Sequence, residues 1–258
     1  MAQQYIKVIL YFCLYISFTC RAESLNVYCD NWPRFCQTDG KGFYLDLVRT
    51  IYQPHGYIIT PHIVPYKRAL SSVVNKKGDI ALGVYQHEIE KVLFPEYADS
   101  ADDLTVMMLN QWQSRWHGEP TLEGQHVLWP SGWALEKYLS VSVNAHEVDS
   151  VETAIKLLRK KRYRYYITVG ALHITARPPA DMHLALLRWI PTYPVFPMND
   201  KGRKLQQIWD MEMVNLIHKG ELARLYLQYG LYDFFHSFIQ EMERKAEKSK
   251  GVMLTPNE

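Results

Sequence analysis

Residues 57–84 read YIITPHIVPYKRALSSVVNKKGDIALGV, and this stretch predicts the fold class. Its first eight residues have the composition of a strand, which ends at Pro65. Four apolar residues then recur on one face at helical spacing: Ala69, Leu70, Val73 and Val74. We expect Gly78 to end this helix as a left-handed cap. Residues 80–84 form a short apolar run, typical of a strand buried on both faces of a parallel sheet. Strand, helix and strand in this order predict α/β architecture.

The same alternation continues on both sides of this stretch. Upstream, residues 24–29 predict a strand, and residues 43–51 predict a helix that begins after Gly42. Downstream, strands are expected at four places: 104–112, 126–129, 165–169 and 184–189. Helices are expected at three further places: after Ser131, from Asp149 with Glu152 as a capping box, and beyond Pro194.

Two α/β blocks joined by two extended crossings predict two lobes with a cleft between them. We expect lobe 1 to comprise residues 23–106 and 193–258, and lobe 2 to comprise residues 107–192. Ligands of open α/β sheets bind beyond the carboxyl ends of the strands. The loops after the strands of both lobes are therefore expected to face one cleft.

The first 22 residues have the features of a cleavable export signal. Lys7 provides the positive charge, and residues 8–16 provide an apolar core that is shorter than the roughly 20 residues needed to cross a bilayer. We expect cleavage near Ala22 and a periplasmic location. The alternative is a lipoprotein modified at Cys20, although residues 17–19 make a poor lipobox because small residues are wanted directly before the cysteine.

The charge balance argues against a nucleic-acid partner. Removal of the signal takes away Lys7 and Arg21 but no acid, which leaves 27 basic and 27 acidic side chains. A neutral chain lacks the basic footprint of nucleic-acid binding.

Two cysteines remain after the signal, Cys29 and Cys36. In an oxidising compartment this pair is expected to form a disulfide. Free thiols or a metal pair are the alternatives, but no second Cys or His pair stands at zinc-finger spacing. We therefore expect neither a metal site nor a cofactor.

Several different short motifs follow one another in a characteristic order along residues 24–235. They are GFYLDL at 42–47, PYKRAL at 65–70, KGDI at 77–80, LEGQHV at 122–127, and KGEL at 219–222 followed by Tyr229 and Gly230. In this order they resemble the family-3 extracellular solute-binding proteins, the type II periplasmic binding proteins of amino-acid importers. The resemblance implies a two-lobed α/β protein that binds a small-molecule solute as a monomer. Its implied partner is the membrane subunit of an importer, or a membrane sensor.

The sequence departs from this family at one informative place. Amino-acid binders of the family carry an arginine after the third strand, which pairs with the α-carboxylate of the ligand. Residues 85–91 contain no arginine here, and lysine does not reproduce the bidentate pairing of a guanidinium group. The chemical class of the solute is therefore left open.

The candidate ligand-binding residues lie after predicted strands or match the resemblance. Asp30 is expected to accept from an amine and Trp32 to stack on the ligand, with packing of the Cys29–Cys36 loop as the alternative role of Trp32. Arg68 either contacts the ligand or forms a surface ion pair. The backbone N–H groups of residues 131–133 are expected to hold an anion at a helix start. The remaining members of the set are Tyr66, Tyr85, Gln86, Ser131, Gly132, Trp133 and Thr168.

Binding without catalysis is the function expected from these features, with lobe closure about hinges near residues 105–110 and 190–194. A ligand-sensing or interaction module without a transport role is the alternative. A periplasmic hydrolase is disfavoured because the sequence has no G-x-S-x-G elbow and no metal motif. The acidic residues Asp99, Asp102 and Asp103 are interpreted as part of a solvated loop.

Overall fold

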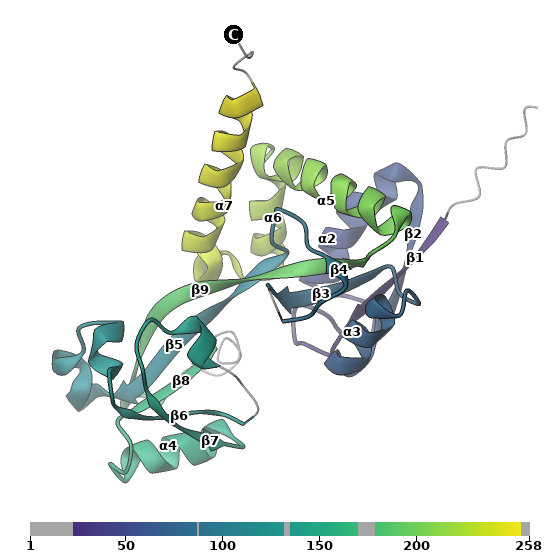
Figure 1. The fold of residues 1–258 in the computed structure, drawn as a ribbon. Helices are drawn as coiled ribbons and strands as arrows, with labels where there is room; N and C mark the ends of the chain where they lie inside the picture. Colours follow the sequence, from purple (N-terminus) through teal and green to yellow (C-terminus); the bar gives the residue numbers. More distant parts are fainter. Residues whose placement is uncertain (1–22, 87, 132–134, 170–178, 254–258) are drawn as a thin grey trace, which may run out of the picture.

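The computed structural model describes residues 23–86, 88–131, 135–169 and 179–253. They form two lobes joined by the long strands β5 (Ser100–Leu109) and β9 (Met182–Pro197), which run side by side between them (Figure 1). The strand order is β2-β1-β3-β9-β5-β8-β6-β7, with β4 (Val92–Leu93) paired to β9. The predicted α/β class and two-lobed architecture are confirmed. The predicted lobe boundaries fall inside β5 and β9 and stay predictions.

The first lobe has a mixed sheet at its centre. β1 (Glu23–Cys29) pairs in parallel with β2 (Tyr57–Ile63) and with β3 (Ile80–Tyr85), and β3 pairs antiparallel with β9. Both β1 and β3 lie inside the sheet; β1 alternates buried and partly exposed residues from Leu25 on, and the first three residues of β3 are all buried. α3 (Tyr66–Val74) connects β2 to β3.

Four helices complete the first lobe: α2 (Phe43–Tyr52), α5 (Asp200–His218), α6 (Glu221–Gln228) and α7 (Tyr232–Met253). Their apolar faces meet around Trp209, which is fully buried and donates from its indole Nε1 to the carbonyl of Tyr97 over 2.8 Å. α5 begins where the Asn199 side chain accepts from the backbone N–H of Gly202 over 2.7 Å, a favoured N-cap interaction.

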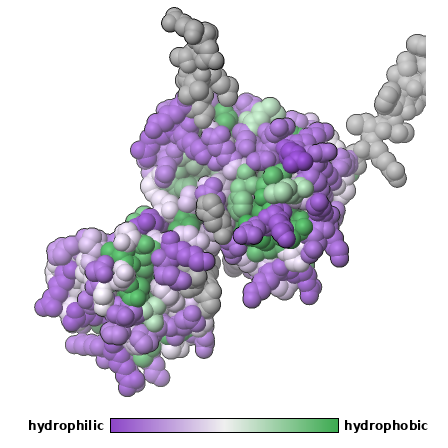
Figure 2. All heavy atoms as spheres, in the orientation of Figure 1, coloured by the Kyte–Doolittle hydropathy of each residue, from purple (hydrophilic) through white to green (hydrophobic). Residues whose placement is uncertain are grey.

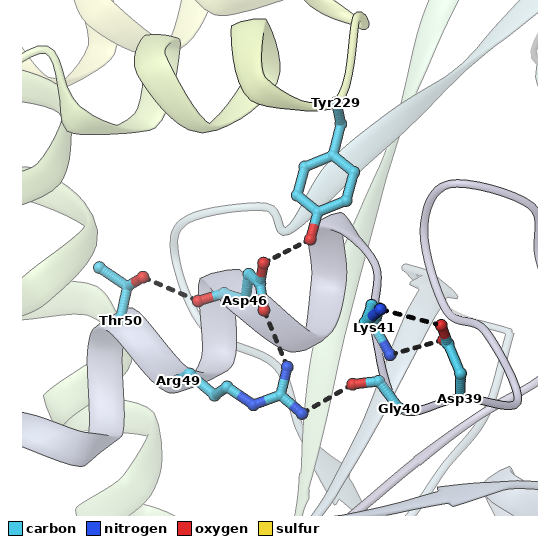
Figure 3. Close-up of polar contacts among 7 residues, drawn as sticks. All are labelled: Asp39, Gly40, Lys41, Asp46, Arg49, Thr50 and Tyr229. Atoms are coloured by element: carbon cyan, nitrogen blue, oxygen red, sulfur yellow. Dashed lines mark hydrogen bonds and ion pairs between the residues drawn. The ribbon is translucent and has the colours of Figure 1, made fainter.

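Two motifs that lie far apart in the sequence contact each other in this lobe (Figure 3). Asp46, in the first turn of α2, accepts a hydrogen bond from the Tyr229 hydroxyl beyond the end of α6. The second Asp46 oxygen pairs with Arg49 over 2.8 Å, and Arg49 also donates to the Gly40 carbonyl over 2.7 Å. Asp46 and Tyr229 therefore join the start of the chain to its C-terminal helices and have a structural role.

The second lobe has three parallel strands beside the connecting strands and, among its described residues, one α-helix. β6 (His126–Pro130) pairs with β7 (Asn144–Val148) and with β8 (Tyr165–Val169), and β8 pairs antiparallel with β5. α4 (Val151–Arg159) packs on the sheet through Ala154 and Leu158. The 3-10 helices of the described residues are η1 (Gln53–His55) in the first lobe, and η2 (Asn110–Arg115), η3 (Glu119–Leu122) and η4 (Leu135–Tyr138) beyond β5. Within the described chain, no helix combines the length and the hydropathy needed to cross a bilayer.

Several local predictions need correction. The left-handed residue after α3 is Lys76, with φ of 59°, and not Gly78. Gly78 is needed for another reason, because a Cβ there would lie 2.7 Å from the Tyr28 ring. The N-cap of α4 is Ser150 in place of Asp149.

Other corrections concern longer stretches. The helix expected directly after Ser131 is represented among the described residues by the short 3-10 helix η4. β9 continues through Pro191 and Pro194, because pairing with β5 and then β3 keeps it extended. β7 was not expected from the sequence. The predicted signal, its cleavage point and Cys20 lie outside the described residues.

Candidate functional site

The loop after β3 joins two tyrosines of the first lobe. Glu88 accepts through one carboxylate oxygen from the Tyr66 hydroxyl over 2.7 Å and from the backbone N–H of Tyr85 over 3.2 Å. Tyr66 is the first residue of α3, and its own backbone N–H donates to Asp30 over 2.9 Å. Asp30, just after β1, therefore positions the start of α3, and Glu88 positions the Tyr66 ring.

Tyr85 connects this loop to β5 and to the second lobe. Its hydroxyl donates to the Asp102 carboxylate, and its ring lies against that of Tyr138 in η4, with centroids 5.5 Å apart. We call Tyr66, Tyr85, Glu88, Asp102 and Tyr138 the interlobe cluster. Figure 2 shows the surface narrowing between the two lobes that contribute these residues.

The interlobe cluster carries negative charge without a cationic partner among the described residues. No ion pair in the described part of the chain includes Glu88 or Asp102. Burial raises the pKa of Asp102 to about 6, although its hydrogen bond from Tyr85 opposes the shift. Burial is the main cause, and the neighbouring carboxylates the second cause, of a raised pKa in all three cluster tyrosines. The hydroxyls therefore remain protonated donors.

A disulfide holds the aromatic ring next to the cluster. Cys29 at the end of β1 is bonded to Cys36, with Cα atoms 6.4 Å apart, so the predicted pair is confirmed in the structure. Within this loop Trp32 donates from its backbone N–H to the Cys36 carbonyl over 2.9 Å. The Trp32 ring contacts Tyr66 with centroids 5.8 Å apart and meets Tyr44 edge-on at 6.1 Å.

Gly83 of β3 makes room for the Trp32 ring. Its φ is +71°, and a Cβ there would lie 3.0 Å from a Trp32 ring carbon. We expect Gly83→Ala to lower the free energy of unfolding by about 2–3 kcal/mol, because left-handed strain adds to overpacking. The matched control is Gly56→Ala, since Gly56 has a similar φ of +83° but nothing near its Cβ position. We expect Gly56→Ala to lower the free energy of unfolding, measured by urea unfolding, by only about 1 kcal/mol. Equal losses would mean that Trp32 does not require Gly83.

A buried carboxylate lies directly behind the cluster. Asp99 is only 1% exposed and accepts from the Gly83 N–H over 2.8 Å and from the Thr192 hydroxyl over 2.6 Å. Because Thr192 donates to Asp99, the Tyr44 hydroxyl donates to Thr192 over 3.1 Å. Burial raises the pKa of Asp99 to about 7, against the lowering effect of these hydrogen bonds. This network links α2, β3 and β9 where the two connecting strands leave the first lobe.

Comparison with solved structures identifies the architecture. The ligand-binding core of GluR0 in complex with L-glutamate superposes with a TM-score of 0.63 at 17% identity, over 81% of this chain and 99% of that one. The probable amino-acid ABC transporter extracellular-binding protein YtmK from Bacillus subtilis gives a TM-score of 0.63 at 18% identity, over 83% and 100%. The chain has the periplasmic-binding-protein fold. The resemblance noted in the sequence is thereby confirmed at the level of fold.

The same fold also includes an ancestor of an enzyme. The ancestral amino acid-binding protein AncCDT-1, a precursor of cyclohexadienyl dehydratase, gives a TM-score of 0.58 at 14% identity, over 80% of this chain and 95% of that one. No model of a known protein family matches the sequence, and no curated protein matches it either.

The periplasmic-binding-protein fold brings some of the predicted site residues together. Tyr66 and Tyr85 belong to the interlobe cluster, and Trp32 and Asp30 touch Tyr66 directly. The Asp30 oxygens accept from the backbone N–H groups of Asn31 and Tyr66, so its observed role is to hold the start of α3.

The other predicted residues are exposed, already hydrogen-bonded or buried in a strand, or they lie outside the described chain. Arg68 and Gln86 are exposed, and neither belongs to an ion pair among the described residues. The Ser131 N–H donates to the Val148 carbonyl over 3.0 Å, so the sheet already uses this donor. Gly132 and Trp133 lie outside the described residues. Thr168 is fully buried in β8, opposite Thr105 of β5.

Sequence reasoning missed the acidic half of the site. Interpreting Asp99, Asp102 and Asp103 as a solvated loop was wrong, because β5 begins at Ser100 and buries Asp99 and Asp103 while leaving Asp102 partly exposed. Glu88 lies within residues 85–91, the stretch that lacks an arginine, so its carboxylate was a signal available in the sequence. Tyr138 carried no such signal, because only the packing of the lobes places it beside Tyr85. The described residues include no group of three or more potential metal ligands.

Proposed function

We propose that this protein captures a small polar solute between its lobes and presents it to a membrane partner, such as an importer subunit. The observation that carries the proposal is the Tyr85–Tyr138 contact, which joins a strand end of one lobe to a helix of the other. A solute bound there touches both lobes, and its binding energy then favours the closed arrangement. The fold it shares with YtmK, named as part of an amino-acid ABC transporter, supports this role and an extracytoplasmic location.

Binding is favoured over catalysis by the position of the most perturbed carboxylate. A catalytic acid or base has to reach the substrate, but Asp99 is only 1% exposed and its oxygens accept from Gly83 and Thr192. The raised pKa of Asp99 is therefore attributed to its burial where β5 and β9 leave the first lobe. The Tyr66 and Tyr85 hydroxyls donate to Glu88 and Asp102, so the two rings are held in place for contact with a ligand.

Thermal unfolding of residues 23–258 against a panel of small solutes tests this function. The panel comprises amino acids, polyamines, choline, organic acids, short peptides and sugars. A compound present at about 100 times its dissociation constant is expected to add about 2.7 kcal/mol to the free energy of unfolding. Tyr138→Ala is expected to abolish the shift, because Tyr138 is the second lobe's part of the cluster.

Tyr232→Ala is the matched control for this experiment. Tyr232 lies at the start of α7, where it contacts His236 and takes no part in the interlobe cluster. We expect the control to retain the ligand-induced shift. A panel that produces no shift in the unsubstituted protein would contradict the solute-binding role and favour an interaction module.

A further inference from the structure

We infer that the solute is a small organic cation, held by the carboxylates and aromatic rings of the interlobe cluster. The inference rests on the proposed function and names the chemical class of its ligand. Two features support it, the sign of the local charge and the arrangement of the rings, and an unpaired donor in the second lobe indicates a neutral acceptor group on the same solute.

The carboxylates of the cluster lie beside its tyrosines. Burial is the largest cause of the raised pKa of Tyr66, Tyr85 and Tyr138; Glu88 and Asp102 add to it at Tyr66 and Tyr138, and Asp102 adds to it at Tyr85. Tyrosines elsewhere do sense cations, since Arg164 and Arg115 lower the pKa of Tyr165 against the effect of burial. Glu88 and Asp102 accept from the cluster tyrosines and belong to no ion pair among the described residues, so the charge that they place between the lobes attracts a cation and repels a carboxylate ligand.

The rings are held in place for contact with a positive charge. Tyr66 is tied to Glu88 and Tyr85 to Asp102, so each ring lies beside a carboxylate. Trp32 packs against Tyr66 and is itself held by the Cys29–Cys36 loop. An ammonium group between aromatic faces and carboxylates gains cation–π and charge–charge attraction together, which is the usual recognition of amines and quaternary ammonium compounds.

The second lobe adds a donor that lacks a partner. Trp129, near the end of β6, is 7% exposed, and its Nε1–H has no hydrogen-bond acceptor among the described residues. It belongs to the apolar core against which Tyr85 and Tyr138 pack. A buried unpaired donor is unfavourable, and a neutral oxygen of the solute would satisfy it. The positive charge of the solute is then left to Glu88 and Asp102.

Asp102 should make binding of a cation depend on pH. The described groups whose pKa Asp102 raises include no base; they are Tyr44 of α2, Tyr66 of α3, Tyr85 of β3, Asp99 before β5 and Tyr138 of η4. Because the pKa of Asp102 is raised to about 6, acidification neutralises the group that attracts the ligand. Affinity for a cation is therefore expected to rise with pH through this range.

Isothermal titration of residues 23–258 with choline, putrescine, succinate, L-glutamate and glucose tests the inference. Choline or putrescine is expected to bind, and the two acids and glucose are not. The charge of choline does not change with pH, so its affinity is expected to fall about tenfold between about pH 8 and about pH 5. Glu88→Gln and Asp102→Asn are each expected to weaken binding at least about tenfold at the higher pH.

Asp200→Asn is the matched control, because it also removes one negative charge but from a fully exposed side chain on α5. It is expected to leave the affinity for the cation unchanged. Binding of succinate, L-glutamate or glucose without binding of either cation would overturn the inference and leave the proposed function standing. Cation binding that survives both Glu88→Gln and Asp102→Asn would overturn the assigned site. If none of the five compounds binds, and no member of the wider solute panel raises the melting temperature, the proposed function itself is contradicted.

Discussion

The free energy of unfolding of residues 23–258 is expected to fall as the pH rises from about 4 to about 8, and most of this fall is expected to come from Asp99. Burial raises the pKa of Asp99 in the folded protein to about 7, whereas the unfolded chain has the ordinary value of 3.8. Between these values the folded state keeps a proton that the unfolded state has released. The stabilisation is therefore fully present below the pKa of Asp99 in the unfolded chain and is lost as the pH rises to its pKa in the folded protein. The total loss is on the order of 4 kcal/mol.

Urea unfolding at a series of pH values, with Asp99→Asn as the comparison, measures this effect. The amide oxygen can still accept from the Gly83 N–H, and the amide nitrogen can donate to Thr192, which then turns its own proton away. The variant is therefore expected to fold and to show a much flatter pH dependence. A residual slope is expected from Asp102, whose pKa is raised to about 6.

The control for this series is Asp39→Asn, since Asp39 is exposed and contacts the Lys41 ammonium across 3.6 Å and the Lys41 backbone N–H over 3.1 Å. It is expected to follow the pH dependence of the unsubstituted protein. If Asp99→Asn did the same, Asp99 would have to be ionised without penalty in the folded state, and its network with Thr192 and Tyr44 would need another explanation.

Loss of the Cys29–Cys36 disulfide is expected to lower the free energy of unfolding by about 2–3 kcal/mol, because the short loop it closes gains conformational freedom mainly in the unfolded chain. Both cysteines are fully buried in the first lobe. The double variant Cys29→Ala/Cys36→Ala avoids buried hydroxyl groups and isolates the bond. Because the loop positions Trp32 against Tyr66, we also expect the double variant to bind solute more weakly.

Reductant provides the matched control for the disulfide. In urea unfolding it is expected to bring the unsubstituted protein down to the stability of the double variant and to leave the double variant unchanged. Equal stability of all four samples would show that the bond contributes nothing to folding. An effect of reductant on the double variant would show that the loss has another source.

The residues behind these predicted changes in stability contact one another in the first lobe. The disulfide holds Trp32, Gly83 gives Trp32 space, and Asp99 binds the Gly83 N–H. The interlobe cluster lies against this group through the Trp32–Tyr66 contact. Stability of the joint between the lobes and recognition of the solute are therefore coupled through a few side chains.

The sequence by itself determined the elements that follow from local pattern. Residues 57–84 alternate between strand and helix periodicity, and β2, α3 and β3 form where this pattern predicts them. The pair Cys29 and Cys36 lies only seven positions apart, so chain geometry already brought the thiols together. Tyr66 and Tyr85 were found because they border these predictable elements.

Only the tertiary structure decided which charged groups are buried and which rings meet. Asp102 and Asp103 pair with Ile190 and Trp189 in the ladder between β5 and β9, and no local pattern in an acidic stretch reveals partners so distant in the chain. Tyr138 reaches Tyr85 only because the two lobes fold against the same pair of strands. Periodicity in the sequence indicates which face of a helix or strand is apolar. The burial of a carboxylate depends instead on pairing between strands that are distant in the chain, here β5 and β9, and this pairing forms the acidic half of the site.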